Sequence, residues 1–346
     1  MACVAVPGGV RLRFYLPLVR FLDHIDRGAI GDMLGRDEYF WLDLDGPSEA
    51  EIDTLEDLFH FHPLALEDLR KKGQRPKLED FGDYMFLVYY GAVAPEGEGP
   101  PSPDAPPDAG PVGGERIQLE EVHAFISGGY LVTVHDGKCS ALDEVRKRLD
   151  QQAPSSEQFV VYRVLDALTD TFFPLLEDLE DRLEHLDEEI FSHPSPDHLQ
   201  PLTELRRDLV MLGRVATPQR DLLARHIDDI LEIPGLQPDS KDYFRDIYDH
   251  AIRISDQIDS FRDLLIGSRD AYLSVTSNRL NEISKQLTVV ATIFLPLSFI
   301  VGFFGQNFGW MVRNINTSAE FWLIGGGSMV VSLVALVIWL RRGAYA

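Results

Sequence analysis

The sequence has very little cysteine: Cys3 and Cys139 are the two cysteines among its 346 residues. Neither belongs to a Cys-x-x-Cys pair or to a Cys/His spacing typical of zinc sites. This excludes a scaffold built on disulfides and is typical of a protein in a reducing cytosol. The first residues, MACVAVPGGVRLRF, also lack a basic start followed by an apolar core, so we expect no signal peptide.

Positive charge is scarce as well. There are 32 Lys and Arg against 56 Asp and Glu, which gives a net charge of -24, and all of this acidic excess lies before Gln286. This balance argues against nucleic acid as a partner, because phosphate contacts need Lys and Arg. The acidity fits a protein that collects cations, although it also serves solubility alone.

Motifs of catalysis are missing too. The chain has no GxxxxGK[ST], no GxSxG and no recognisable nucleophile–base arrangement. The sequence therefore favours a protein that is not an enzyme.

Two long runs near the C-terminus contain no charged residue. They are QLTVVATIFLPLSFIVGFF (residues 286–304) and WLIGGGSMVVSLVALVIWL (residues 322–340), each of 19 residues. A helix of that length covers about 28 Å, close to the thickness of one hydrocarbon core. These runs predict two membrane spans rather than two buried core helices.

The charges that flank the two runs predict their orientation. Arg279 and Lys285 precede the first run, and Arg341 and Arg342 follow the second. Residues 305–321, between the two runs, hold one basic and one acidic residue, Arg313 and Glu320. The positive-inside rule then places both termini in the cytosol and residues 305–321 outside the cell, with residues 341–346 as a basic cytosolic tail.

The first 155 residues mix strand and helix patterns and predict a cytosolic α/β domain. Strands are expected at residues 38–43, 84–93, 117–127 and 130–135, the last two joined by the hairpin signal Gly128-Gly129. Ser48 with Glu51 forms a capping box that opens a helix, and Ser140 opens another helix. Residues 94–114, rich in Pro and Gly, are expected to form a flexible loop.

Helical periodicity follows. Residues 156–239 are expected to form a helical hairpin, with one helix from about residue 156 to HPSP (193–196) and a second from about Asp197. The stretch EDLEDRLEHLDEE (177–189) holds eight acids and is either a solvated face or a surface that attracts cations. Residues 240–304 predict one stalk helix of about 60 residues that continues into the first span.

The first span carries a stripe of small and hydroxylic residues at heptad spacing. Its members are Asn281, Ser284, Thr288, Ala291, Leu295, Ser298, Gly302 and Gly305. Such a stripe either lines a water-filled pore or packs against another helix. It holds no carboxylate, so an ion would cross largely hydrated, which suits Mg²⁺ because Mg²⁺ dehydrates reluctantly. One chain with two spans cannot enclose a pore, so a pore needs several copies.

The sequence resembles the CorA family of divalent-cation transporters. The resemblance rests on HPLALEDL (62–69), QRPKLEDFGDYMFLV (74–88), YFRDIYDH (243–250), FRDLL (261–265) and YLSVTSNRLNEISKQLTVVATIFLPLSFIVGFFGQNF (272–308). It implies a cytosolic α/β domain, a long stalk helix, two spans and a funnel-shaped homopentamer in the cell membrane. It also implies passive entry of Mg²⁺, often also of Co²⁺ and Ni²⁺, driven by the membrane potential.

Where this family carries Gly-Met-Asn after its first span, the present chain has Gly305-Gln306-Asn307. The resemblance implies that the Asn307 amides form a ring that receives the hydrated ion, with Gln306 as a departure from the family pattern. It further implies a pore-facing Asn281, constrictions at Leu287 and Leu295, and Ser284 and Ser298 in place of the family's methionine and threonine.

The resemblance also implies a regulatory site. Asp68 and Asp246 match a pair that holds Mg²⁺ between neighbouring cytosolic domains, and Glu67 adjoins it. A bound ion would stabilise the closed state, and its loss would let the carboxylates repel and the pore open. No organic cofactor is expected. Two other functions stay open: a ZntB-like zinc transporter, and an anchored sensor or scaffold that conducts nothing.

Overall fold

The computed structural model describes residues 19–93, 117–151, 157–232, 241–306, 309–315 and 317–343. The predicted loop at residues 94–114 and Asn307 lie outside the described residues. The chain forms two compact units, Met1–Ser268 and Arg269–Ala346, which are called the first and the second unit below.

The first unit contains a six-stranded sheet of order β1-β2-β6-β5-β4-β3. The strands are β1 (Arg20–Leu22), β2 (Phe40–Asp45), β3 (Lys77–Asp80), β4 (Met85–Val93), β5 (Gln118–Ile126) and β6 (Tyr130–His135). β1, β2 and β6 are parallel, whereas β3, β4, β5 and β6 pair antiparallel. The four strands predicted from the sequence are confirmed to within two residues at each end. β1 and β3 were missed because they are short edge strands with little pattern of their own.

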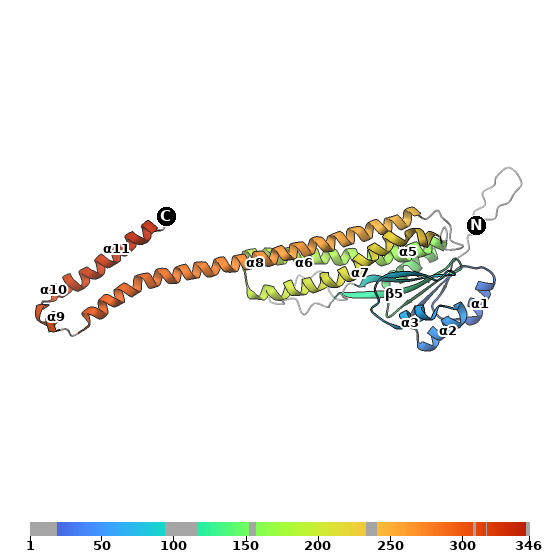
Figure 1. Cartoon of the computed structure of the whole chain (residues 1–346), viewed down its shortest axis with the longest axis horizontal. Helices are drawn as coiled ribbons and strands as arrows, with labels where there is room; N and C mark the ends of the chain where they lie inside the picture. Colours follow the sequence, from blue (N-terminus) through green and yellow to red (C-terminus); the bar gives the residue numbers. More distant parts are fainter. Residues whose placement is uncertain are drawn as a thin grey trace. The chain divides into compact units, whose positions relative to one another are not determined.

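Helices cover both faces of this sheet. Figure 1 shows α1 (Arg27–Gly35), α2 (Glu49–Phe59) and α3 (Pro63–Arg70) on one side. On this side the Phe61 ring stacks on Phe125 with ring centroids 3.9 Å apart. On the other side Trp41 and Leu87 share one buried apolar cluster with Leu142 of α4 (Ser140–Gln151) and with Leu165 of α5 (Glu157–Asp170).

Local signals set several helix ends as predicted. Ser48 and Glu51 form a complete capping box at the start of α2. The hairpin between β5 and β6 closes at Gly128-Gly129, where the Ser127 N–H donates to the Tyr130 carbonyl over 2.9 Å. In these places neighbouring residues alone satisfy the backbone groups, so the sequence suffices to find them.

The single helix predicted from about residue 156 to HPSP is wrong, because the chain forms two helices there. α5 ends at Asp170 and α6 (Phe172–Ser192) begins after Thr171. The Thr171 hydroxyl donates to the Leu168 carbonyl over 2.6 Å and accepts the N–H of Ala92 in β4 over 2.7 Å. The sheet contact of Thr171 thus lies at the break, and Pro174 follows it, which has no N–H to donate to the Asp170 carbonyl.

Two further helices follow. α7 (Leu199–Leu231) has Pro218 in its interior and is preceded by a short 3₁₀ turn, η1 (Pro196–His198). α8 (Lys241–Phe304) is one helix of 64 residues, which confirms the predicted long helix. Within the first unit its buried side chains recur every three or four residues, as in Phe244, Ile247, Ala251, Ile254 and Ile258.

The second unit consists of helices. After the end of α8 come α9 (Gly309–Asn314), α10 (Ser318–Phe321), the π-helical turn η3 (Trp322–Gly326) and α11 (Gly327–Gly343). Residues 305–321, predicted as a loop, thus include two short helices. The segments Lys241–Phe304 and Ser318–Trp339 are each long and apolar enough to cross a membrane.

Candidate ion path and metal sites

The predicted stripe lies along α8 and is open to the surroundings of a single chain. None of residues 273–306 is buried, and Leu287 and Leu295 are each 69% exposed. The Thr288 hydroxyl donates to the Ser284 carbonyl over 2.8 Å, and Thr292 donates to Thr288 in the same way. Each hydroxyl uses its hydrogen within the helix, so its oxygen keeps lone pairs that can accept from water or face a hydrated cation.

α8 ends just before the Gly305-Gln306 pair. The Gly305 N–H donates to the Val301 carbonyl over 2.9 Å, and the Gln306 N–H donates to the Phe303 carbonyl over 3.3 Å. Gly305 does not have a positive φ, so this position does not require the left-handed backbone that favours glycine. A Cβ here would lie 3.2 Å from the Val301 carbonyl oxygen, so the constraint is one of space.

The three acids expected to bind a regulatory ion lie on two helices. Glu67 and Asp68 are in the last turn of α3, and Asp246 is exposed on α8. Lys77 Nζ lies 2.5 Å from Asp68 Oδ2 and 2.8 Å from Glu79 Oε1, and Lys71 pairs with Glu67. No hydrogen bond or ion pair found among the described residues joins Asp246 to Asp68 or Glu67. Burial lowers the pKa of Lys77, but its bonds to the two carboxylates outweigh this and raise it.

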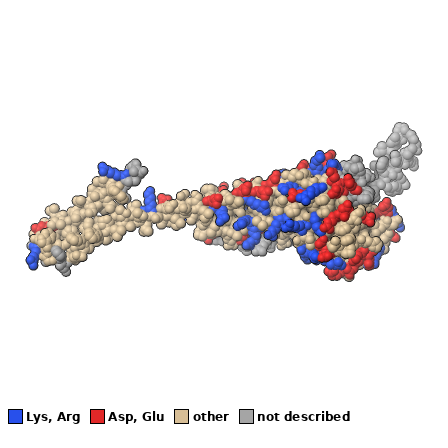
Figure 2. Space-filling model, in the orientation of Figure 1, with Lys and Arg blue, Asp and Glu red and all other residues tan. Residues whose placement is uncertain are grey.

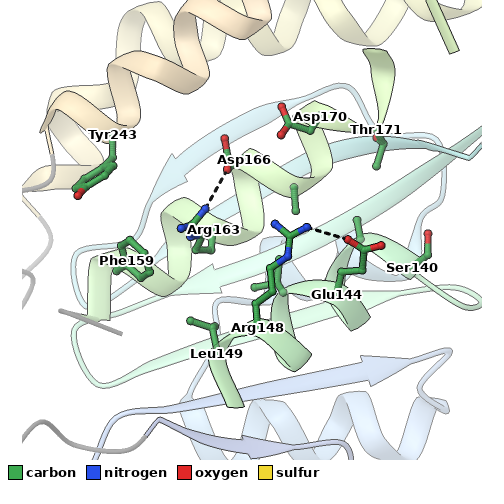
Figure 3. A pocket seen from close by; sticks show the side chains of 13 residues that line it. Ser140, Glu144, Arg148, Leu149, Phe159, Arg163, Asp166, Asp170, Thr171 and Tyr243 are labelled. Atoms are coloured by element: carbon green, nitrogen blue, oxygen red, sulfur yellow. Dashed lines mark hydrogen bonds and ion pairs between the residues drawn. The ribbon is translucent and has the colours of Figure 1, made fainter. Parts of the chain in front are cut away.

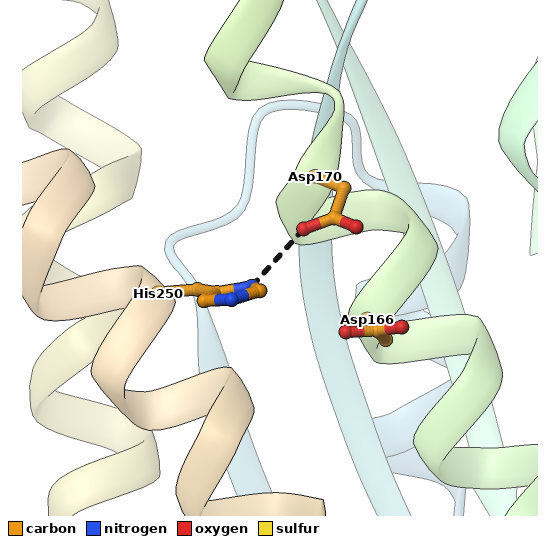
Figure 4. A group of neighbouring side chains, drawn as sticks. All are labelled: Asp166, Asp170 and His250. Carbon is orange, nitrogen blue, oxygen red and sulfur yellow. Dashed lines mark hydrogen bonds and ion pairs between the residues drawn. The ribbon is translucent and has the colours of Figure 1, made fainter.

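A further cluster that sequence reasoning missed lies where α5 meets α8. Asp166, Asp170 and His250 each offer a ligand atom, and these atoms lie within 4.8 Å of one another (Figure 4). His250 Nδ1 is 3.0 Å from Asp170 Oδ1. Burial, and then the charge of Asp170, raise the pKa of Asp166. An imidazole beside two carboxylates suits Zn²⁺, Co²⁺ or Ni²⁺ better than Mg²⁺.

The sequence does contain a signal for this cluster. Asp166 and Asp170 are four residues apart, as are Asp246 and His250, so each pair lies on one face of its helix. Only the packing of α5 against α8 brings the two faces together.

Beside this cluster is a groove of about 640 Å³ between α4 and α5, with Tyr243 of α8 at its edge (Figure 3). Arg148 of α4 and Arg163 of α5 reach into it, and each lies beside an acid of its own helix, at 3.3 Å from Glu144 and 3.7 Å from Asp166. Glu144, Asp166 and Asp170 outnumber the two arginines in the lining, so the groove offers an anion no clear advantage.

Charge is unevenly divided between the units. Figure 2 shows acidic and basic side chains spread over the first unit and few on the second. Residues 286–304 and 322–340 carry none. The polar site residues among those described therefore fall into two kinds: carboxylates and imidazole in the first unit, and amides and hydroxyls in the second.

The family model described as "CorA-like Mg2+ transporter protein" matches residues 36–342. The chain belongs to the CorA-like Mg²⁺ transporter family. The match includes strands β2 to β6, helices α2 to α8 and the second candidate span, so the resemblance predicted from the sequence is confirmed.

Similar proteins are named as transporters of different ions. The putative metal ion transporter YfjQ of Bacillus subtilis is 34% identical over 309 residues, which cover 87% of this chain and 88% of the relative. The cobalt/magnesium transport protein CorA of Thermotoga maritima is 32% identical, over 78% of this chain and 74% of the relative. The zinc transport protein ZntB of Yersinia pestis is 24% identical, over 88% and 87%.

Solved structures share the CorA fold. The complete CorA magnesium transporter of Methanocaldococcus jannaschii superposes with a TM-score of 0.71 at 23% identity, over 87% of this chain and 90% of that one. The full-length CmaX protein gives a TM-score of 0.68 at 22% identity, over 88% of each chain. The α/β domain, the long helix and a C-terminal helix able to span a membrane are thus confirmed as a CorA fold.

Proposed function

We propose that this chain forms a homopentameric channel in the cell membrane that admits Mg²⁺ down the membrane potential, together with Co²⁺ or Ni²⁺. The observation that carries the proposal is the match of residues 36–342 to the CorA-like family. It is supported by the 32% identity to a relative named as a cobalt/magnesium transport protein. Both termini lie in the cytosol, because basic residues precede the first span and follow the second.

The ion path follows α8 of each copy. The pore-facing positions are Asn281, Ser284, Leu287, Thr288, Ala291, Leu295, Ser298 and Gly302. Their exposure in the single chain supports this, since a small and hydroxylic face open to its surroundings can enclose water when several copies meet. Rings of Leu287 and Leu295 form constrictions that block ions when they dewet.

At the outer end, Gly305, Gln306 and Asn307 form the selectivity filter. A ring of amide oxygens from Asn307 receives the ion with most of its hydration shell. Mg²⁺ keeps its waters tightly, so a filter of neutral oxygens selects it by the size and geometry of the hydrated ion.

The gate responds to cytosolic Mg²⁺ bound between copies at Asp68 and Asp246, with Glu67 beside them. Asp246 is exposed, which leaves it available to a neighbouring copy. An ion bound there offsets the repulsion between acids and favours the closed state, so a fall in Mg²⁺ shifts the population to the open state.

The test of conduction is ion flux into proteoliposomes with Mg²⁺- and Zn²⁺-sensitive dyes inside and an imposed negative potential. We expect Mg²⁺ entry that depends on the potential and falls at least tenfold in Asn307→Ala. The matched control is Asn314→Ala, since the Asn314 amide donates to the Trp310 carbonyl over 3.1 Å within α9. No flux of either ion would overturn the channel and favour the anchored sensor.

A zinc transporter is the second candidate function. It is favoured by the ZntB relatives and by the imidazole in the Asp166, Asp170 and His250 cluster. Zn²⁺ entry that follows an imposed pH gradient in the same liposomes would assign the chain to this branch.

The regulatory site is tested by charge reversal. Protease protection of the full-length protein is expected to increase with Mg²⁺ in the wild type and to lose that dependence in Asp246→Lys. Asp263→Lys, at another exposed position on α8, is the control and should keep it. Unchanged Mg²⁺ dependence in Asp246→Lys would remove the regulatory role.

A further inference from the structure

Lys77 forms the least exposed lysine ion pair among the described residues. Its side chain is 26% exposed and that of Asp68 is 22% exposed. The pairs Lys71–Glu67, Lys72–Asp136 and Lys241–Asp228 are all more than half exposed. Water screens such exposed pairs strongly, so the charge of Lys77 acts on its carboxylate more than the other lysines act on theirs.

The fold holds Lys77 in this place. It lies at the start of β3, opposite Val88 of β4, and its Nζ is 5.6 Å from the centroid of the Phe86 ring. The connection from α3 to β3 is fixed by the Glu121 carboxylate, which accepts the N–H groups of Gly73 and Gln74 over 2.6 and 3.0 Å. Gly73 has a φ of +76°, which suits glycine at this turn.

Two carboxylates share the Lys77 ammonium. Asp68 Oδ2 and Glu79 Oε1 lie 2.5 and 2.8 Å from Nζ, and they come from different elements, α3 and β3. If a second cation bound Asp68, it would lie within a few ångströms of the ammonium and be repelled by it. Lys77 could then stay paired with Glu79 alone, so releasing Asp68 leaves no unpaired charge.

We propose that Lys77 is a built-in competitor of the divalent cation at Asp68 and that it sets the Mg²⁺ concentration at which the regulatory site fills. The inference rests on the proposed function, in which Asp68 is a ligand of the regulatory ion. Glu79 is the alternative partner that accepts Lys77 when the metal binds. Without Lys77, the channel would close at a lower concentration of cytosolic Mg²⁺.

The test measures the Mg²⁺ concentration that gives half-maximal protease protection of the full-length protein. Lys77→Met removes the charge but keeps an unbranched apolar side chain over Phe86, and we expect the half-point to fall about tenfold. Lys77→Arg keeps the charge and should stay within about threefold of the wild type. The matched control is Lys72→Met. Lys72 lies five positions before Lys77 and pairs with Asp136, so the variant removes the same charge from a different ion pair. It should shift the half-point less than about twofold.

A second variant works in the opposite direction. Glu79→Gln leaves Asp68 as the one carboxylate bound to Lys77, so the half-point should rise several-fold. If Lys77 only fastened α3 to β3, both variants would lower the melting temperature in metal-free buffer and neither would move the half-point. This pair of opposite shifts keeps the inference testable if Lys77→Met folds poorly.

The outcomes separate the inference from the proposed function. Mg²⁺-dependent protection in the wild type, lost in Asp246→Lys but unchanged in Lys77→Met and Glu79→Gln, overturns the inference alone. Protection that appears in Lys77→Met but not in the wild type supports the inference. In the wild type, Lys77 would then occupy Asp68 at all the Mg²⁺ concentrations used. No Mg²⁺ dependence in any of these proteins overturns both.

Discussion

The two units of this molecule bury their apolar residues in opposite ways. In the first unit Phe40, Phe61 and Phe125 are each 2% exposed or less. In the second unit Leu287 and Leu295 are 69% exposed, and Phe299 is 74% exposed. The first unit has a core of its own, whereas the second leaves these apolar side chains uncovered within one chain.

This difference separates two sources of stability. Sheet and helices in the first unit remove apolar surface from water within one chain. In the second unit that gain is absent from the single chain, as expected for helices of the proposed membrane-spanning oligomer. Substitutions should therefore affect folding in the first unit, and assembly or flux in the second.

The largest expected contrast is between two phenylalanines. Phe61→Ala should destabilise the first unit by about 3–5 kcal/mol, because it leaves a cavity beside Phe125. Phe299→Ala, on the exposed face of α8, should leave the first unit unchanged. Amide hydrogen exchange of β5 and β6 in the full-length protein measures both, and equal protection in the two variants would contradict the comparison.

A buried hydroxyl gives the next contrast. Thr133 is fully buried; it accepts the Trp41 indole N–H over 2.8 Å and donates to Asp43 over 2.5 Å. Thr133→Val should cost about 1–3 kcal/mol, because both partners lose a hydrogen bond inside the core. In Thr288→Val the lost bond is local to α8, so the urea midpoint of the first unit should not move. A shift of that midpoint with Thr288→Val would show that the units are not independent.

The smallest effect concerns pH. All ten histidines precede residue 269, so titration near neutral pH acts on the first unit. Burial lowers the pKa of His135, but its hydrogen bond to Asp43 and the charges of Asp43 and Glu120 outweigh this, so the net pKa is raised. Because the pKa of His135 is raised in the folded state, its contribution to stability is fully present below about pH 6.5. That contribution is lost as the pH rises through the folded pKa.

His135→Gln should therefore flatten the pH dependence of the first unit's melting temperature above about pH 6.5. His185→Gln, at a side chain that is 74% exposed and pairs with Glu189, is the control. The same slope in His135→Gln and in the wild type would contradict the role of the Asp43 contact.

Much of the fold was predictable because its signals are local. The charge-free runs, the heptad stripe, the Gly128-Gly129 hairpin and the Ser48 capping box depend on residues close in sequence. The short strands β1 and β3 were not predictable, because an edge strand of three or four residues has no period to detect. The contact at the Thr171 break was not predictable for another reason, namely that the Thr171 hydroxyl bonds to β4, about 80 residues away in sequence.

The site divides in the same way. The sequence marked Asp68 and Asp246 through their motifs, and it marked the stripe on α8 through its spacing. It gave no sign that Lys77 would hold Asp68. The spacing placed Asp166 and Asp170 on one helix face, but it did not show that His250 would meet them.

By itself the sequence determined the family, the two candidate spans and the type of most elements, because periodicity, length and charge are properties of contiguous residues. Only the tertiary structure decided which charges meet. Lys77, Asp68 and Glu79 come from two elements joined by a fixed turn, and Asp170 and His250 lie 80 residues apart in sequence, on α5 and α8. Their distances depend on how the sheet and helices pack, which no single segment encodes.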